Sequence, residues 1–327
     1  MLKLKYLFNN KDLAQMLLSN WEYDNDDPNL LKYYRISANA VYWCKNQGET
    51  FFLRFAPSEE KSKESILAEL EFITYLRNNG FSAVDTIFSK NGNELEEVNT
   101  PWGTYYVVAF KKVCGKPLDQ VQLTDDIIYG WGKALAKLHK LSSEYTPIYN
   151  HRSDWKDIMN WMEDVLSDFP EEVAAKKELY LLKDYFLKLP VTKDNFGLIH
   201  FDFEFDNVFY DEVTKTFTPI DFDDAMYHWY GLDIDQVLDS IEDELPEEQV
   251  EPATNLFING YRSEFHISDD MIKLLPVFRR YINLYGYIRV LRSIEEKWNN
   301  EPDWIADLRT RLENSLNRRK SNFTKPL

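Results

Sequence analysis

Three polar side chains in one short stretch have the types and spacing needed for phosphate chemistry. His200, Asp202 and Asn207 stand in the order H-x-D-x-x-x-x-N within HFDFEFDN, and Asp221 follows in IDFDDA, at the end of an apolar run. A carboxylate can orient an acceptor hydroxyl and take its proton, while an amide oxygen and a second carboxylate can hold Mg²⁺ against nucleotide phosphates. Asp202 and Asn207 are close enough in sequence for one tight loop to present both groups to one phosphate. The combination indicates phosphoryl transfer.

Two other interpretations of the same stretch use fewer of its residues. Phenylalanines alternate with acidic residues there, which is also the pattern of a half-buried strand with an acidic face. On that interpretation, His200 makes a structural hydrogen bond. A hydrolase using Asp202 and Glu204 as a carboxylate pair would place both on one strand face, but it leaves Asn207 and Asp221 without a role.

The first third of the chain is predicted to form strands around a single helix. Residues 39–45 and 49–56 are rich in aromatic and β-branched side chains and are separated by Asn-Gln-Gly, which indicates a hairpin. Residues 62–78 carry an apolar stripe at helical spacing that ends at Asn-Asn-Gly. Two more strands are expected near 84–89 and within 103–113.

After a connector near residues 111–117, the pattern becomes mainly helical. The expected elements are helices at 125–141, 154–167 and 171–188, short strands within 198–220, and helices from 233 to about 316, broken at Pro246, Pro252 and Pro276. The organisation is a small β-rich N-lobe followed by a larger helical C-lobe with one β insertion.

At this point the chain resembles a known family, that of the aminoglycoside phosphotransferases and choline kinase-like enzymes, which are small-molecule relatives of the protein kinases. The family's catalytic loop commonly reads H-G-D-x-x-x-x-N and is followed by I-D-[FW]-x, and HFDFEFDN and IDFDDA match these motifs. The resemblance runs from about residue 30 to about residue 300 and is strongest over 198–235. It implies an α+β, bilobal protein-kinase-like fold. Its N-lobe, residues 1–112, would hold a small antiparallel sheet with one key helix, and its C-lobe, residues 113–327, would be mostly helical.

Carried over position by position, the resemblance also implies roles for the polar residues. Asp202 would be the catalytic base, and His200 would support its loop without reacting. Asn207 and Asp221 would be the Mg²⁺ ligands, with ATP as the phosphate donor. Asp233 matches a structural brace that follows the metal-binding segment.

The nucleotide side is expected to use a basic residue and an acidic partner. Arg54 stands where the family usually has Lys, and an arginine is not equivalent to a lysine at a phosphate site. Glu69 is the predicted partner because it lies on the apolar stripe of the 62–78 helix, where a carboxylate needs a buried cation, whereas Glu71 lies on the opposite face. The alternative for Arg54 is a surface arginine at a strand end.

Two further positions depart from the family pattern. Residues 34–42 would cover the phosphates but contain no glycine, so Ser37 and Asn39 would contact phosphate directly, unless the segment is a plain structural turn. Phe201 replaces the glycine of the catalytic loop.

Composition limits the class of protein. The chain has 327 residues with a net charge of −17, which argues against a nucleic-acid-binding protein. Its N-terminus has no apolar core typical of a signal peptide, and no apolar run has the length of a membrane span, so we expect a cytoplasmic protein without a membrane partner. Cys44 and Cys114 have neither disulfide-framework nor metal-ligand spacing.

The predicted function is ATP- and Mg²⁺-dependent transfer of the γ-phosphate to a hydroxyl of a small molecule such as an aminoglycoside-like antibiotic, an amino alcohol or a sugar. A bacterial protein Ser/Thr kinase of the same fold is an alternative, disfavoured because no long activation segment follows Asp221. A non-catalytic nucleotide-binding module is another, disfavoured because such a module needs no base. Acidic residues near the loop favour a cationic acceptor, whereas a set of late arginines favours an acceptor that carries phosphate or carboxylate: Arg279, Arg280, Arg289 and Arg292.

Overall fold

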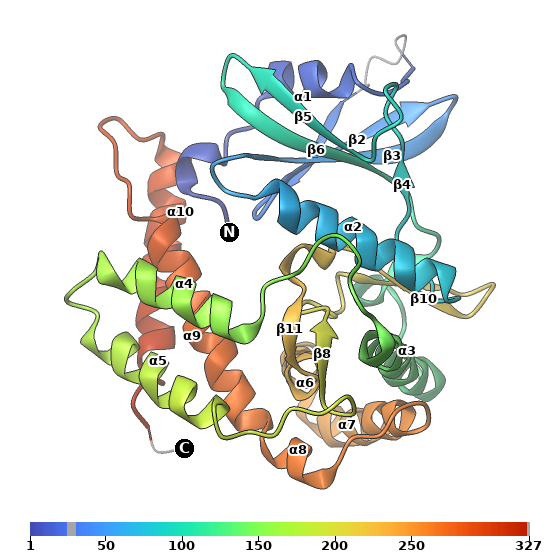
Figure 1. Ribbon diagram of the computed structural model, residues 1–327, viewed down its shortest axis with the longest axis vertical. Coiled ribbons are helices and arrows are strands. Elements are labelled where there is room, and N and C mark those ends of the chain that lie inside the picture. The colour runs from blue at the N-terminus through green and yellow to red at the C-terminus, as the bar shows by residue number, and fades with distance from the viewer. Residues whose placement is uncertain (25–30, 326–327) are drawn as a thin grey trace. The chain divides into compact units, whose positions relative to one another are not determined.

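The computed structural model describes residues 1–24 and 31–325 of the chain (Figure 1). It contains two compact units, each assembled from separate stretches of sequence. Unit 1 comprises Met1–Leu67, Val84–Val113 and Arg289–Arg318, and unit 2 comprises Ala68–Ala83, Cys114–Ile288 and Arg319–Leu327. The predicted functional domains, residues 1–112 and 113–327, remain a prediction. The two compact units describe how the chain packs, not what each part does.

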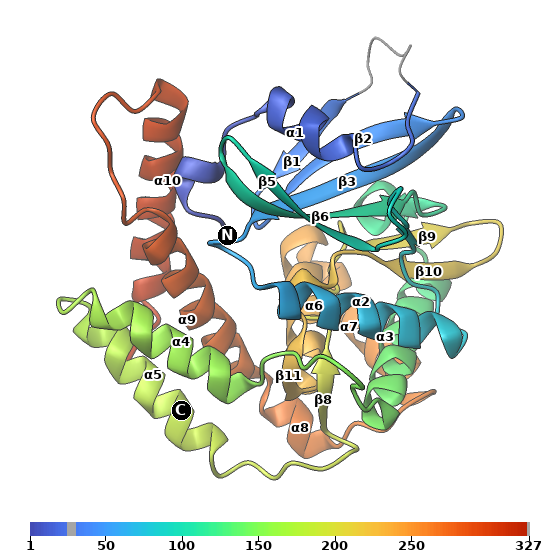
Figure 2. The ribbon, with the colours of Figure 1, turned by 45° about the horizontal axis from the view of Figure 1, so that its top comes forward.

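Unit 1 is built on a six-stranded antiparallel sheet. Its strands are β1 (Lys32–Ile36), β2 (Ala40–Asn46), β3 (Glu49–Pro57), β4 (Thr86–Ile87), β5 (Leu95–Thr100) and β6 (Gly103–Lys111). The order is β1-β2-β3-β6-β4, and β5 pairs with β6. Helix α1 (Lys11–Leu18) lies along one face of the sheet (Figure 2), where Leu13, Leu17 and other apolar side chains form a core with β2, β3 and β6.

Unit 2 is mainly helical. Its principal helices are α3 (Asp125–Glu144), α4 (Trp155–Ser167), α5 (Val173–Phe186), α6 (Gly231–Glu244), α7 (Glu247–Arg262) and α8 (Asp269–Lys273). Three helices run from one unit into the other: α2 (Lys63–Asn78), α9 (Leu275–Ser293) and α10 (Asp303–Lys320). Two small antiparallel sheets complete the unit, one of β7 (Lys116–Pro117), β9 (Val208–Asp211) and β10 (Thr216–Pro219), the other of β8 (Phe196–Ile199) and β11 (Met226–Trp229).

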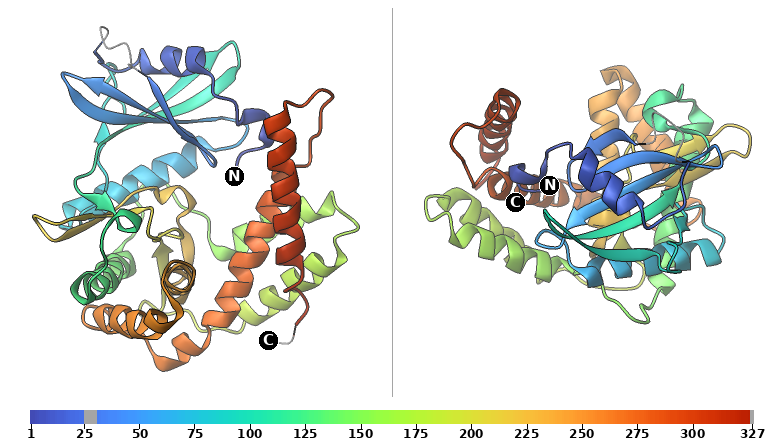
Figure 3. Two further views of the ribbon diagram at one scale, coloured as in Figure 1. Left: turned by 180° about the vertical axis from the view of Figure 1, so that it is seen from behind. Right: turned by 90° about the horizontal axis from the view of Figure 1, so that it is seen from above.

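Helices α3 and α7 lie side by side (Figure 3), and two glycines allow their close approach. A Cβ atom placed on Gly132 would come within 2.0 Å of the Phe257 carbonyl oxygen, and one on Gly260 would come equally close to the Tyr129 carbonyl oxygen. Only glycine leaves room for backbone at that distance. This packing supports α3, which carries a residue of the candidate site described below.

The structure confirms the predicted fold class and most predicted elements. Residues 34–42 lie in the β1–β2 hairpin, and their place over the phosphates stays a prediction. Helix α1 and strands β1, β5, β7 and β11 were not predicted. The polar side chains of β5 do not show the alternating pattern of a strand. The expected break at Pro252 is wrong, since α7 continues through it. One missing backbone hydrogen bond is tolerated there because packing stabilises the helix. Within the described residues, no helix combines the length and apolarity needed to cross a bilayer.

Candidate active site

The side chains of Asp202 and Asn207 lie in direct contact in unit 2. The Asn207 amide nitrogen donates to the Asp202 carboxylate at 2.6 Å and to the Asp202 backbone carbonyl at 3.3 Å. These bonds orient the amide, so its oxygen is directed away from Asp202 and is the atom offered to a ligand. The spacing recognised in the sequence therefore brings the two groups together, as expected.

His200 connects the loop of Asp202 and Asn207 to the segment that carries Asp221. Its Nδ1 accepts from the Asp202 backbone N–H at 3.2 Å, so Nε2 carries the proton and donates to the Ile220 carbonyl at 3.0 Å. The Ile220 N–H in turn donates to the Asn207 carbonyl at 2.9 Å. Burial lowers the pKa of His200 to about 4, so the ring is neutral near pH 7. The geometry fits a supporting role.

Asp233, at the start of α6, accepts hydrogen bonds from the backbone of the same loop. Its carboxylate accepts from the N–H groups of His200 and Phe201, each at 2.8 Å, and lies 3.0 Å from Nε2 of the buried His139 on α3. His139 Nδ1 lies 2.8 Å from the Tyr261 hydroxyl of α7. The brace implied by the resemblance is present, but His139 was missed because a lone histidine in an amphipathic helix gives no signal.

Two residues of the site adopt left-handed backbone conformations. Phe201 has φ of 65° and Asp221 has φ of 61°. Such a conformation costs a non-glycine residue about 1–2 kcal/mol. This explains why the family prefers glycine at the position of Phe201. The phenyl ring is buried, 5.3 Å from the Tyr285 ring, and Gln236 Nε2 donates to the Phe201 carbonyl at 3.0 Å.

Carboxylates converge on this loop. The pKa of Asp202 is raised well above its usual value, first by burial and then by the negative charges of Glu204, Asp221, Asp224 and Asp206. Burial also raises the pKa of Glu204 to about 7, with further contributions from Asp206, Asp239 and Asp243. This repulsion is relieved by a cation, so the site favours positive charge.

The residues present fit a divalent cation that is held partly by another molecule. Among residues 1–24 and 31–325, no group of three or more His, Cys, Asp or Glu side chains is arranged to hold a metal ion alone. Asn207 and Asp221 offer only oxygen ligands, which Mg²⁺ prefers, and Mg²⁺ commonly takes its other ligands from water and substrate phosphates.

The predicted nucleotide-side residues are divided between the two units. Arg54 lies in β3 of unit 1, only 8% exposed, with its guanidinium 4.8 Å from the centre of the Phe110 ring. The alternative of a surface arginine is therefore wrong. Ser37 and Asn39 form the turn of the β1–β2 hairpin, where the Ser37 N–H donates to the Asn39 carbonyl at 3.1 Å.

Glu69 belongs to unit 2 and is 1% exposed, so the predicted choice between the two glutamates agrees with its burial. Glu71 instead accepts backbone hydrogen bonds from the loop after α3. The pairing of Arg54 with Glu69 would join the two units and stays a prediction.

Comparison with known proteins identifies relatives along the whole chain. The model of the phosphotransferase enzyme family matches residues 36–264. Amicoumacin kinase of Bacillus subtilis (strain 168) is 22% identical over 95% of this chain and 94% of its own length. The solved structure of amicoumacin kinase hAmiN in complex with AMP-PNP, Ca²⁺ and Ami has a TM-score of 0.77 and 19% identity, covering 99% of this chain and 97% of that one.

A second solved structure has the same fold. A microcompartment-associated aminopropanol kinase has a TM-score of 0.66 and 20% identity, covering 94% of this chain and 95% of that one. Both structural matches confirm the protein-kinase-like fold. The chain therefore belongs to the phosphotransferase enzyme family, and it is an enzyme that transfers a phosphoryl group to a hydroxyl of a small molecule.

Proposed function

We propose that this enzyme uses ATP and Mg²⁺ to phosphorylate a hydroxyl group on a cationic small molecule. The observation that carries the proposal is the contact between Asp202 and Asn207, 2.6 Å apart on a loop braced by Asp233. A base and a metal ligand held side by side suit a reaction in which positioning and charge neutralisation provide most of the catalysis.

In the proposed reaction, Asp202 orients the acceptor hydroxyl and receives its proton. The acceptor oxygen forms a bond to the γ-phosphorus while the bond from that phosphorus to the ADP oxygen breaks. The raised pKa of Asp202 suits a general base, because a base works best when its pKa approaches the working pH. Asn207 and Asp221 would hold Mg²⁺, which neutralises the phosphate charge when bound.

Isosteric substitutions test these roles. We expect Asp202→Asn to lower kcat about 10²- to 10⁴-fold while the thermal shift caused by Mg²⁺ and ATP persists, because the base is lost but the metal ligands remain. We expect Asp221→Asn to weaken that shift. The exposed Asp307→Asn, on α10, serves as the control. A wild-type rate for Asp202→Asn would exclude it as the base.

Charge pairing favours a cationic acceptor over an anionic one. Arg279 pairs with Asp235, Asp239 and Glu242. Arg280 makes two hydrogen bonds to Glu178, at 2.7 and 2.8 Å. Arg279 and Arg280 therefore have carboxylate partners of their own. Glu204 instead lies near other carboxylates, and an ammonium group would relieve the repulsion between them. One of the structural matches is an aminopropanol kinase, and aminopropanol carries an amine.

A panel of acceptors tests the charge preference. We expect ADP release with amine-bearing hydroxyl compounds, such as amicoumacin, amino alcohols, aminoglycosides and spectinomycin, and little with neutral sugars or sugar phosphates. Asp243→Asn should raise KM for an amine-bearing acceptor several-fold with little change in KM for ATP, because only the acceptor gains from this charge. Faster turnover of an anionic acceptor would contradict the proposal.

A protein substrate is disfavoured by the short connection after the metal-binding residue. Only residues 222–230 separate Asp221 from α6, and four of them form β11. This leaves no long segment to bind an extended peptide.

A further inference from the structure

The loop of residues 145–153, between α3 and α4, makes polar contacts with two parts of unit 2 that the reaction would use. At one end it is held by Glu71 of α2, and at the other end Arg152 holds the segment that follows Asp221. We propose that this loop is a strut in which Glu71 and Arg152 position the metal-binding segment, residues 221–225, against α2. The inference rests on the proposed function for what the positioned segment does.

Glu71 fixes the first half of the loop through one carboxylate. Its oxygens accept from the backbone N–H groups of Ile148 at 2.5 Å and of Tyr149 and Asn150 at 3.2 Å each. The Tyr145 hydroxyl adds a fourth bond, at 3.2 Å. Burial opposes ionisation of Glu71, but the four hydrogen bonds together outweigh it and the pKa of Glu71 lies below its usual value, so the carboxylate is charged near neutral pH.

Arg152 fixes the second half by donating to backbone carbonyls. Its Nε donates to the Ala225 carbonyl at 2.6 Å, and a terminal nitrogen donates to the Asp223 carbonyl. The next residue continues the contact, because the Ser153 carbonyl accepts from the Tyr227 N–H at 3.0 Å. One guanidinium therefore holds the end of the short 3-10 turn Phe222–Asp224, which begins directly after Asp221.

The position of that turn matters because Asp221 is held in a left-handed conformation. With φ of 61°, Asp221 would relax to an ordinary conformation unless neighbouring structure prevented it. Contacts that hold the carbonyls of Asp223 and Ala225 also restrict the backbone segment that begins at Asp221. A ring contact supports the same arrangement, since Phe72 of α2 lies 4.9 Å from the Tyr145 ring and 6.1 Å from the Phe222 ring.

The apolar side chains at the tip of the loop do not anchor it. Ile148 is 75% exposed and Tyr149 is 83% exposed, although their backbone N–H groups are bound to Glu71. The tip is thus held by hydrogen bonds to a carboxylate rather than by burial. Removing that charge should release the loop without opening a cavity in the core.

The first test is hydrogen exchange in the nucleotide-free protein, which needs no acceptor. We expect Arg152→Gln and Glu71→Gln to speed hydrogen exchange of the amides of residues 222–227 about tenfold. Local opening of this segment then costs less free energy, because the hydrogen bonds of the strut are already missing. Arg152→Lys keeps a charge and one donor and should fall between wild type and Arg152→Gln. The controls are Lys140→Gln and Glu64→Gln, whose side chains are exposed on α3 and α2, and they should exchange as wild type does.

The second test is the Mg²⁺ concentration that gives half of the thermal shift produced with saturating ATP. We expect Arg152→Gln to raise this Mg²⁺ concentration about fivefold. The double variant, Arg152→Gln with Glu71→Gln, should raise it little further, because both residues act through one strut. If the double variant raised the Mg²⁺ concentration by the product of the two single effects, the two residues would act independently and the strut would be overturned. Unchanged hydrogen exchange at residues 222–227 in both single variants would also overturn it. If the wild-type enzyme failed to use ATP while the exchange results held, the strut would stand and the proposed function would fall.

Discussion

At the scale of single residues, Phe201 shows how one site combines strain with packing. Its left-handed backbone is unfavourable for any side chain, but its ring is buried against Tyr285. Burial of a phenyl ring contributes about 3–5 kcal/mol, more than the 1–2 kcal/mol cost of the conformation. The side chain can therefore be retained where the family uses glycine.

This balance predicts an inverted order of two substitutions. Phe201→Ala and Phe201→Gly both lose the ring, but only alanine keeps the backbone penalty. We expect Phe201→Gly to be more stable than Phe201→Ala by about 1 kcal/mol, whereas glycine is usually the less stable of the two. Free energies of unfolding in urea measure the difference. An alanine variant as stable as the glycine variant would mean that the loop relaxes when the ring is removed.

At the scale of elements, a buried histidine lies where β11 packs against α5 and α9. His228 of β11 is fully buried, and its Nδ1 accepts from the Trp229 N–H at 2.9 Å. Rings of Phe186, Phe278 and Tyr281 lie within 6 Å of it. Burial lowers the pKa of His228 to about 3, outweighing the opposing effect of the Asp233 charge.

The sign of the resulting pH dependence follows from this lowered pKa. An unfolded histidine binds a proton below about pH 6.5, whereas folded His228 does not until about pH 3, so its contribution to stability is lost as the pH falls through this window. We expect the stability advantage of wild type over His228→Phe to shrink by about 2–3 kcal/mol between pH 7.5 and pH 4.5. Urea unfolding at both pH values measures it. An equal slope for wild type and His228→Phe would contradict the assignment.

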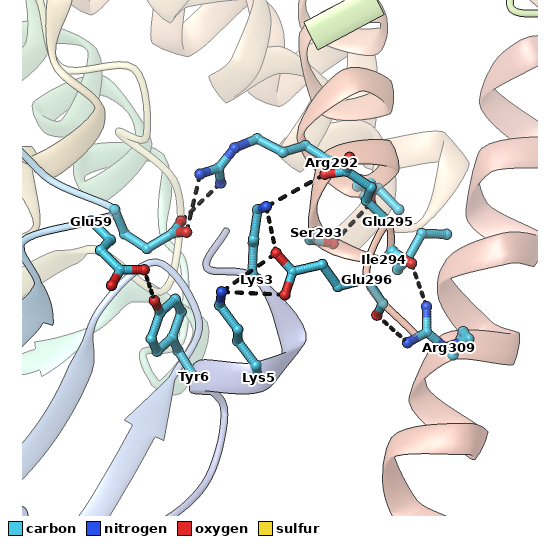
Figure 4. Close-up of polar contacts among 12 residues, drawn as sticks. Lys3, Lys5, Tyr6, Glu59, Arg292, Ser293, Ile294, Glu295, Glu296 and Arg309 are labelled. Carbon is cyan, nitrogen blue, oxygen red and sulfur yellow. Dashed lines mark hydrogen bonds and ion pairs between the residues drawn. The ribbon is translucent and has the colours of Figure 1, made fainter. Parts of the chain in front are cut away.

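At the scale of the whole molecule, distant parts of the sequence form one compact unit. Residues 289–318 belong to unit 1, where ion pairs tie them to the N-terminal segment (Figure 4). Lys3 pairs with Glu296 at 2.8 Å, and both nitrogens of the Arg292 fork donate to Glu60, at 2.8 and 3.0 Å. The Glu60 side chain is only 5% exposed, against 44% for Glu296, so solvent screens the Arg292–Glu60 pair less than the Lys3–Glu296 pair.

The ion pairs should therefore differ in strength. We expect Arg292→Met to lower the free energy of unfolding by about 2–3 kcal/mol, because it leaves a buried carboxylate without its partner. Lys5→Met removes an exposed pair with Glu296 and should cost less than about 1 kcal/mol. The double variant Glu60→Leu with Arg292→Met should recover part of the loss, since no charge is then stranded. Equal losses for Arg292→Met and Lys5→Met in urea would show that burial does not strengthen the inner pair.

The sequence by itself determined the class of enzyme, because the residues that indicate phosphoryl transfer lie close together along the chain. His200, Asp202 and Asn207 fall within one short loop, so their spacing alone predicted that Asp202 and Asn207 would be presented together, and the Gln47–Gly48 turn specified the β2–β3 hairpin. Only the tertiary structure decided which distant residues support that loop. His139 supports that loop through Asp233 from 94 residues away, and Arg292 meets Glu60 across 232 residues. Such pairs are set by the packing of whole elements, which leaves no spacing in the sequence to read.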